Sequence, residues 1–413
     1  MQKLFFSFVI FTTPLLSHAA GFALSEQSGS GLGNAFAGAA ASAEDASTIF
    51  FNPAGMTYID GTQVVGTLHL IKPNAEFNNQ GSVAGTARPL GSESDDAGSL
   101  AFVPNFYFMT PLTETVKFGV GVNAPFGLKT EYDRDWIGRF QGIKSDLKTV
   151  NINPSLAFKV NDQLSLGFGL SAMWIQAELT NAVNLGGSER TATVKGDDWG
   201  FGYNLGAIYQ VTNDTRLGIA YRSKIDQHLK GDVRFSVSNG PTPNGDVTAD
   251  TTLPEMVSIS SFSQLNDQWD LLSDVTWTRW SRFQDLTVLR DNGALLSSTA
   301  QNWENTLRYS IGVNYHYNDK LKFRAGVAYD ETPTSNEFRT VRIPDNDRKW
   351  LSFGVAWQAR PDTKLDIGYA HLFVSDVKID DNQTTAVPLG RGRVRGEYDA
   401  SVDILSVQLT HNF

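Results

Sequence analysis

The segment LAFKVNDQLSLGF, residues 156–168, decides the fold, because it places Asn161-Asp162 between two runs in which apolar and polar residues alternate. Such alternation is typical of a β-strand with one apolar face. Asn and Asp form tight turns because their side chains bond to their own backbone and tolerate left-handed angles. The segment therefore predicts two antiparallel strands joined by a short turn.

The same turn recurs along the chain at nearly equal steps. Asn213-Asp214, Asn266-Asp267 and Asn318-Asp319 follow at intervals of 52, 53 and 52 residues, and Pro361-Asp362 follows 43 residues later. A longer polar, Gly-rich stretch separates one turn from the next. Short turns that alternate with long loops are typical of an outer-membrane β-barrel.

The composition supports a barrel and excludes several kinds of site. The 413 residues contain no cysteine, which excludes disulfides, cysteine zinc sites and thiol catalysis. The net charge of −10 argues against nucleic acid as a partner. No apolar run in the mature chain approaches the roughly 18 residues that a membrane helix needs. A membrane protein without such a run must be a closed barrel, because only helices and barrels satisfy their backbone in lipid.

Both ends of the chain carry export signals. Residues 1–19 predict a cleaved signal peptide, since Lys3 precedes an apolar core and Ser17-His18-Ala19 is a small-x-Ala cleavage site. The final strand ends in Phe413, which resembles the recognition signal of the bacterial barrel-assembly machinery. The alternative for residues 1–19 is an uncleaved anchor. The alternative for the final strand is an ordinary amphipathic strand.

We predict an all-β fold with fourteen antiparallel transmembrane strands, joined by six short turns and seven longer loops. The apolar faces end repeatedly in Trp or Tyr, as at Trp174 and Trp357, which fits aromatic girdles at the membrane interface. Charges such as Lys322, Arg324 and Asp274 would then face the lumen. The predicted strands lie near 62–77, 100–110, 115–133, 145–160, 163–180, 197–211, 214–236, 251–265, 268–290, 303–318, 320–331, 348–360, 363–378 and 395–413.

Residues 20–58 do not fit the strand pattern, so we expect an N-terminal hatch before a barrel formed by residues 59–413. The segment is rich in Gly, Ala and Ser, and Asn52-Pro53-Ala54 imposes a turn. A compact segment of this size would plug a fourteen-stranded lumen, which side chains alone cannot close. The alternative is a disordered leader outside the barrel.

The third predicted strand is interrupted in its middle. Val116 to Val122 alternates as a strand, and Asn123-Ala124-Pro125-Phe126-Gly127 then breaks the pattern. Pro cannot donate a ladder hydrogen bond, and Gly inside a strand marks a bend. We expect a kink that opens the wall at this place; a simple strand end is the alternative.

The order and spacing of several short motifs resemble the long-chain fatty acid transporters of the outer membrane, the FadL family, which also includes TodX-like proteins. The likeness covers essentially the whole mature chain. The motifs are Ala20-Gly21-Phe22, Ser30-Gly31-Leu32-Gly33-Asn34-Ala35, Asn52-Pro53-Ala54, Val103-Pro104-Asn105-Phe106, Trp199-Gly200-Phe201-Gly202-Tyr203-Asn204, Tyr221-Arg222-Ser223, Leu253-Pro254-Glu255-Met256, Trp280-Ser281-Arg282-Phe283 and Ile343-Pro344-Asp345-Asn346-Asp347-Arg348.

The resemblance implies passive transport of a hydrophobic ligand, foremost a long-chain fatty acid, which is captured outside and released through a lateral opening in the wall. It implies that Phe22 touches ligand, although core packing explains a lone aromatic equally well. At the family's two basic carboxylate-binding positions this chain has Asn181 and Glu304. Arg190, Lys195 and Arg308 are possible substitutes. Aromatic hydrocarbons or other uncharged hydrophobic compounds therefore remain alternative cargo.

We expect no enzyme activity, because the mature histidines are scattered singly and no Gly-x-Ser-x-Gly motif is present. A general porin would not need a plug, and an adhesin would be expected to have longer loops. No catalytic residue, metal ligand or cofactor motif is predicted. The expected partners are the hydrophobic ligand, outer-membrane lipid and lipopolysaccharide, and the assembly machinery. We expect a monomer in the outer membrane of a Gram-negative bacterium.

Overall fold

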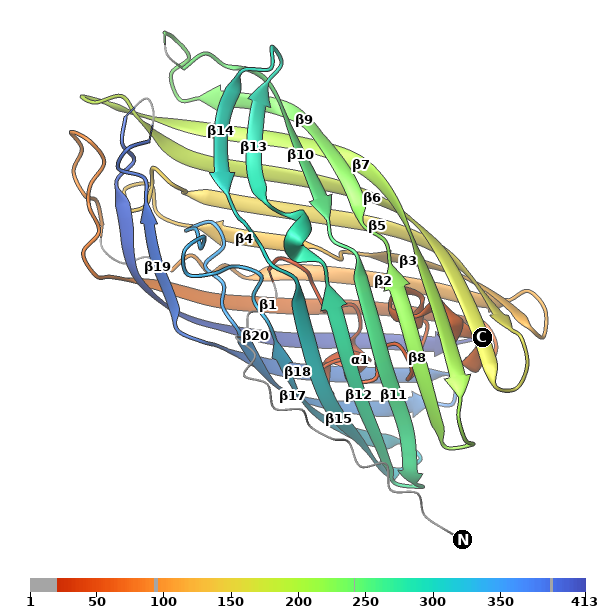
Figure 1. Cartoon of the computed structure of the whole chain (residues 1–413). Helices are drawn as coiled ribbons and strands as arrows, with labels where there is room; N and C mark the ends of the chain where they lie inside the picture. Colours follow the sequence, from red (N-terminus) through yellow and green to blue (C-terminus); the bar gives the residue numbers. More distant parts are fainter. Residues whose placement is uncertain (1–20, 93–95, 241, 387–388) are drawn as a thin grey trace.

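The computed structural model describes residues 21–92, 96–240, 242–386 and 389–413. The predicted signal peptide, residues 1–19, and Ala20 lie outside these ranges. No helix among the described residues is long and apolar enough to cross a membrane. The described strands form one antiparallel sheet, and β1 pairs with β20 along its whole length, which closes the sheet into a barrel (Figure 1).

The wall consists of fourteen spans, which confirms the predicted strand number and fold class. Eight spans are single strands, and six are each broken into two strands. The single strands are β1 (Gln63–Asn79), β2 (Ala101–Pro111), β5 (Lys144–Lys159), β6 (Leu164–Asn184), β7 (Glu189–Gln210), β16 (Leu321–Asp330), β17 (Arg348–Arg360) and β20 (Arg393–Asn412).

Each broken span is interrupted by two or more residues that belong to neither strand. Four of the six follow one another around the wall, between β8 and β15. The pairs are β3 (Val116–Asn123) with β4 (Gly127–Glu131), β8 (Thr215–Arg222) with β9 (Ile225–Phe235), β10 (Gly245–Leu253) with β11 (Met256–Asn266), β12 (Trp269–Thr278) with β13 (Asp285–Arg290), β14 (Leu295–Ala300) with β15 (Thr306–Asn318), and β18 (Thr363–Val374) with β19 (Val377–Asn382).

The outer face of the wall is apolar and is bordered by aromatic residues at two levels. Phe201 is 74% exposed, which suits a side chain that faces lipid. Trp174 pairs with Trp199 at one level, and Tyr209 lies near the short turns at the other. The charged side chains of Arg324 and Asp274 are buried inside the barrel, as predicted.

Four of the predicted long loops are too long, and one of them, 291–302, contains the whole strand β14. We predicted the other three over 181–196, 237–250 and 379–394, but β6 continues to Asn184 and β7 begins at Glu189. β10 likewise begins at Gly245, and β19 extends to Asn382. The parts of the strands that lie within the predicted loops carry polar side chains such as Lys195. They therefore lack the apolar face by which a strand is detected in a sequence.

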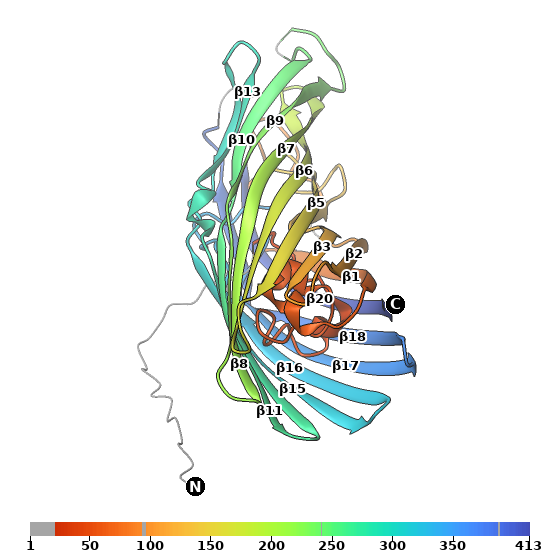
Figure 2. The same ribbon diagram turned by 90° about the vertical axis from the view of Figure 1, so that its right-hand side faces the viewer.

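The N-terminal segment, residues 21–62, is enclosed by the strands (Figure 2). It contains three short helices, the α-helical turns α1 (Gly29–Leu32) and α2 (Thr48–Phe51) and the 3₁₀-helix η1 (Pro53–Tyr58). Asn52 begins the turn predicted here, because its side chain accepts a hydrogen bond from the Ala54 N–H. Its amide also donates to the carbonyls of Ala207 in β7 (3.1 Å) and Ile219 in β8 (3.3 Å). The segment is thus bonded directly to the wall.

Glycines of the wall bring the segment's backbone close to the strands. A Cβ atom on Gly206 would lie 1.8 Å from Oδ1 of Asn52, and one on Gly167 would lie 2.2 Å from the Ala54 nitrogen. A Cβ on Gly218 would meet the Ala40 carbonyl oxygen at 1.9 Å. These contacts are possible only because glycine has no side chain.

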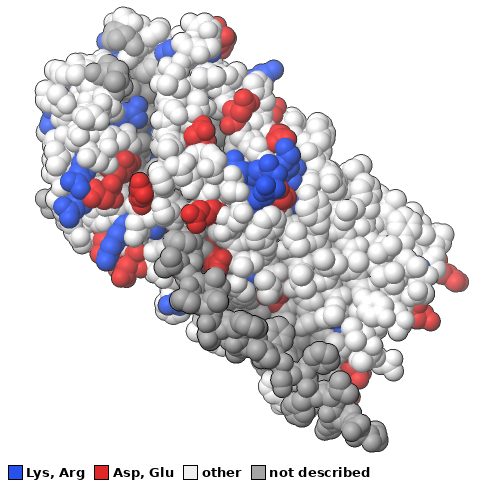
Figure 3. Space-filling model, viewed as in Figure 1, with Lys and Arg blue, Asp and Glu red and all other residues white. Residues whose placement is uncertain are grey.

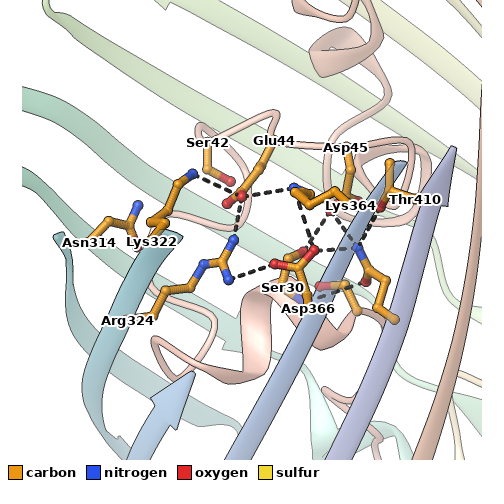
Figure 4. Close-up of polar contacts among 12 residues, drawn as sticks. Ser30, Ser42, Glu44, Asp45, Asn314, Lys322, Arg324, Lys364, Asp366 and Thr410 are labelled. Carbon is orange, nitrogen blue, oxygen red and sulfur yellow. Dashed lines mark hydrogen bonds and ion pairs between the residues drawn. The ribbon is translucent and has the colours of Figure 1, made fainter. Parts of the chain in front are cut away.

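A buried ionic cluster also attaches the segment to β16 and β18 (Figure 4). Glu44 of the segment pairs with Lys322 (3.0 Å), Lys364 (3.1 Å) and Arg324, and Arg324 also pairs with Asp366 (2.7 Å). Burial alone would raise the pKa of Glu44, but the three cations hold that pKa well below its ordinary value. Loss of one partner from such a cluster leaves a buried charge uncompensated, at a cost of about 3–5 kcal/mol.

Candidate functional site

The wall is open between β2 and β4. β2 pairs with β3 from Phe106 to Pro111, but its residues 101–105 pair with β1 alone. β4 pairs with β5 alone. No ladder pair therefore joins these two facing edges within the described residues. The opening is about five residues long, or roughly 16 Å at about 3.3 Å per residue.

The opening results from an extra residue in the third span. Asn123 pairs with Asn151 of β5, and the next pair joins Gly127 to Lys148, so one residue more is accommodated on the β3–β4 side. Such a bulge bends the strand away from its partner. Proline occurs on both margins, Pro104 on β2 and Pro125 on the bulge, and neither can donate to a ladder. The break lies where the sequence pattern predicts a kink.

The first described residues of the chain pair with the bulge from inside the barrel. The Leu24 N–H donates to the Pro125 carbonyl (2.8 Å), and the Gly127 N–H donates to the Phe22 carbonyl (3.0 Å). Phe126 is buried at 2% exposure, and its N–H donates to Oγ1 of Thr149 (3.1 Å). The N-terminal residues thus occupy part of the edge that the wall leaves unpaired.

A cavity of about 700 Å³ passes through the opening. Consecutive residues line it on both margins, namely 100–104 and 122–124. Because neighbouring side chains of a strand point to opposite faces, a cavity lined by all of them must reach the strand's edge. Phe102, which is 62% exposed on the outer face, and buried Phe22 both line it. The cavity therefore connects the barrel interior with the lipid-facing surface.

A second, smaller pocket of about 100 Å³ lies deeper in the barrel. Phe22 lines both cavities, and its ring lies 4.7 Å from that of Trp280, 5.6 Å from Phe283 and 5.5 Å from Trp303 between centroids. Phe22 thus lies at the boundary between the inner pocket and the wall cavity, together with the other residues that line both, namely Leu128, Asp146, Leu147 and Ile343. The side chains that make the inner pocket apolar include Ile175, Ala177, Leu179, Val194, Leu229, Leu253, Leu286 and Val288.

The connection between β16 and β17, residues 331–347, folds inward over this pocket. Val341 is fully buried, and its carbonyl accepts a hydrogen bond from the Tyr132 hydroxyl (2.8 Å). The Asp345 carboxylate accepts from the Gly21 N–H (3.0 Å), which joins this connection to the N-terminal segment. The connection thus contacts both Gly21 of the N-terminal segment and Tyr132, which follows β4.

Arg342 of this connection brings a cation to the apolar inner pocket. Its guanidinium donates to the carbonyl of Lys144 (2.9 Å), to Oγ of Ser145 (3.1 Å) and more weakly to Oδ1 of Asn181 (3.4 Å). Burial, with a contribution from nearby Arg391, lowers the pKa of Arg342 to about 10, so the group stays protonated at neutral pH. Among the described residues no carboxylate forms an ion pair with Arg342, so an anionic ligand group could bind there.

The other residues considered from the sequence lie in different places. Glu304 is exposed, and Arg190 bonds to Asn239 and Thr242 at the outer rim. Lys195 is half-exposed beside Glu178. Arg308 is buried but donates to the Ala35 carbonyl in another part of the barrel. Sequence reasoning missed Arg342, because nothing in the sequence shows that its loop folds inward.

Comparison with known proteins decides the family. The model of the family described as outer membrane protein transport protein (OMPP1/FadL/TodX) matches residues 11–413. The chain belongs to this family. The family consists of transport proteins of the outer membrane, so the protein is an outer-membrane barrel.

Relatives within the OMPP1/FadL/TodX family resemble the chain over most of its length. The long-chain fatty acid transport protein of Escherichia coli O6:H1 is 30% identical over 89% of this chain and 90% of its own. Outer membrane protein P1 of Haemophilus influenzae is 33% identical, with 86% of each chain covered. The crystal structure of a Pseudomonas aeruginosa FadL homologue has a TM-score of 0.90 at 27% identity, covering 95% of this chain and 100% of that one. The Ralstonia pickettii toluene transporter TbuX shares the fold, with a TM-score of 0.69 at 21% identity over 92% and 99% of the two chains.

Proposed function

We propose that the protein transfers long-chain fatty acids passively across the outer membrane, from the inner pocket to the membrane interior through the opening between β2 and β4. The observation that carries this proposal is the apolar path on both sides of Phe22. Arg342, which has no carboxylate partner among the described residues, lies at the inner end of this path. An acyl chain gains about 0.8 kcal/mol for each methylene that leaves water. A lateral exit lets the chain reach lipid without returning to water. The family relationship and the E. coli relative's name support the same function.

In this proposal residues 20–58 form a hatch in the barrel of residues 59–413, with Asn52, Pro53 and Ala54 as its attachment to the wall. Phe22 contacts the ligand at the boundary between the two cavities. Asn123, Pro125, Phe126 and Gly127 keep the wall open. The extensive hydrogen bonding of the hatch supports an exit through the wall rather than along the axis.

The deciding experiment compares uptake of radiolabelled oleate and toluene in a strain that lacks its own transporter. We expect oleate uptake, and we expect Arg342→Gln to reduce oleate affinity by roughly ten- to a hundredfold. That range corresponds to the about 1.5–3 kcal/mol of a hydrogen bond to a charged group. Arg190→Gln is the matched control, because this arginine bonds only to rim loops.

Uptake of uncharged aromatic hydrocarbons is the alternative, and the lack of basic residues at Asn181 and Glu304 favours it. Toluene uptake without oleate uptake, unchanged by Arg342→Gln, would establish this alternative. Oleate uptake that is equally unchanged by Arg342→Gln would contradict the role of Arg342.

A further inference from the structure

A second interruption of the wall lies between β10 and β13. In the described structure these strands pair only at Val247–Arg290 and Thr248–Leu289. Below these pairs, residues 249–253 of β10 face residues 284–288 without a ladder pair. Pairing resumes where the Arg279 N–H donates to the Glu255 carbonyl (3.0 Å) and where Met256 pairs with Thr278. We call this bounded gap the β10–β13 seam.

The inner pocket extends to both margins of the seam. Residues 248–251, which are consecutive in β10, all line the pocket, as do Phe283, Leu286 and Val288 on the other side. Consecutive strand residues point to alternate faces, so the pocket must reach the edge of β10. The seam therefore lies directly over the pocket that holds Phe22 and Arg342.

The lower end of the seam is closed by η2 (Trp280–Arg282). Glu255, in the break between β10 and β11, pairs with Arg279 (3.1 Å) and with Arg282 (2.8 Å). Behind these ion pairs Trp280 is buried, with its ring centroid 5.0 Å from that of Trp303. Glu255 and its two arginines thus form a clasp that holds η2 against the gap. Figure 1 shows η2 between the lower ends of β10 and β13.

The clasp lies near the aromatic level that is farther from the short turns, and it carries exposed positive charge. Trp277 precedes Arg279 by two residues on the same span. Basic side chains gather in the middle of the face seen in Figure 3, over the junction of β8–β9, β10–β11 and η2. Arg279 and Lys224 have side chains that are 45% and 43% exposed. An anionic head group at the membrane interface would meet these cations.

We propose that the β10–β13 seam is a lateral entrance, through which an anionic amphiphile with one acyl chain passes from the outer leaflet into the inner pocket. This inference rests on the fatty acid transport proposed above. The anionic head competes with Glu255 for Arg279 and Arg282, and release of the clasp lets η2 move away from the seam. The ligand thus enters through one side of the wall and leaves through the β2–β4 opening.

The absence of native cysteines permits a reversible test in the full-length protein. Thr251→Cys with Leu286→Cys places one thiol on each margin of the seam, and a short bis-methanethiosulfonate reagent joins them. Ile259→Cys with Val275→Cys is the matched control, because these residues are already paired lower in the same two spans. Val103→Cys with Leu128→Cys locks the β2–β4 opening for comparison.

We expect the seam lock to remove most oleate uptake by cells, the reductant to restore it, and the control lock to have no effect. Full uptake with a locked seam, together with lost uptake when the β2–β4 opening is locked, would refute the entrance and leave the proposed function intact. Full uptake under both locks would refute lateral passage altogether, and with it the route of the proposed function.

Release of the clasp gives an independent measurement. Val288 is 2% exposed, so a cysteine introduced there should react slowly with maleimide. Glu255→Gln should accelerate this labelling, whereas Asp246→Asn should not, because Asp246 is an exposed acid of the same span and lies away from the clasp. An unchanged labelling rate in Glu255→Gln would contradict the closing role of the clasp.

Discussion

Single glycines determine how closely the N-terminal segment approaches the wall. Gly206 has no room for a methyl group, because Oδ1 of Asn52 would lie 1.8 Å from it. The hydrogen bonds of Asn52 to Ala40, Ala207 and Ile219 depend on this approach. Asn52 therefore joins the segment to two strands by hydrogen bonds, and its position depends on Gly206 of β7.

Gly206→Ala should weaken the attachment of the N-terminal segment. Loss of two or three hydrogen bonds at about 1 kcal/mol each predicts roughly 2–3 kcal/mol of lost attachment free energy. Limited proteolysis of the folded barrel should then cleave the segment faster, with a lower melting temperature. Gly66→Ala is the control, because no atom lies within 4 Å of its added Cβ. Equal proteolysis of the two variants would contradict this account.

Arg342 shows the limit of sequence reasoning at this scale. An arginine in a polar loop is normally solvated, and only contacts with Ser145 and Asn181, far away in the sequence, place it in an apolar pocket. Asn181, by contrast, could be identified from the family resemblance. Its altered residue type predicts a carboxylate site that differs from the family's, but it does not point to Arg342.

At the scale of elements, alternation and turn residues predict the fourteen spans but not most of their breaks. The interruption at residues 123–127 is visible because Pro125 and Gly127 spoil the strand pattern. The break at Ser223 and Lys224 has no such residue, and alternation continues on both sides of it. The break at the lower end of the seam does contain Pro254, but the missing pairs between β10 and β13 depend on contacts that no local pattern records.

The bulge in the third span can be repaired by design. Deletion of Ala124 removes the one extra residue, and Pro125→Val restores a backbone N–H donor. With both changes β3 and β4 should form one strand in register with β5. The repaired edge should pair with β2 and close the opening. We expect a folded barrel whose oleate uptake falls to that of cells without the protein.

A heat-dependent shift in gel mobility would verify that the repaired barrel folds, and deletion of Gly81 in the outer β1–β2 loop is the matched control. Uptake by the repaired barrel equal to that of the control would show that the opening is not needed.

At the scale of the whole molecule, the lumen of this barrel is filled and its wall is interrupted, whereas a porin has an open lumen and a continuous wall. The lumen contains the N-terminal segment, held by the Glu44 cluster and by the glycine contacts, whereas the wall has gaps. We propose that this arrangement obstructs water-soluble solutes along the barrel axis and lets an apolar molecule leave through the wall. The central claim is therefore that the ligand leaves through the β2–β4 opening.

Photo-crosslinking with a diazirine-labelled oleate, followed by peptide mapping, tests this claim most directly. We predict adducts on residues 100–104 and 122–126, which line the opening. Adducts confined to residues 57–60 and the neighbouring short turns, with none at the opening, would show an axial exit and contradict the account.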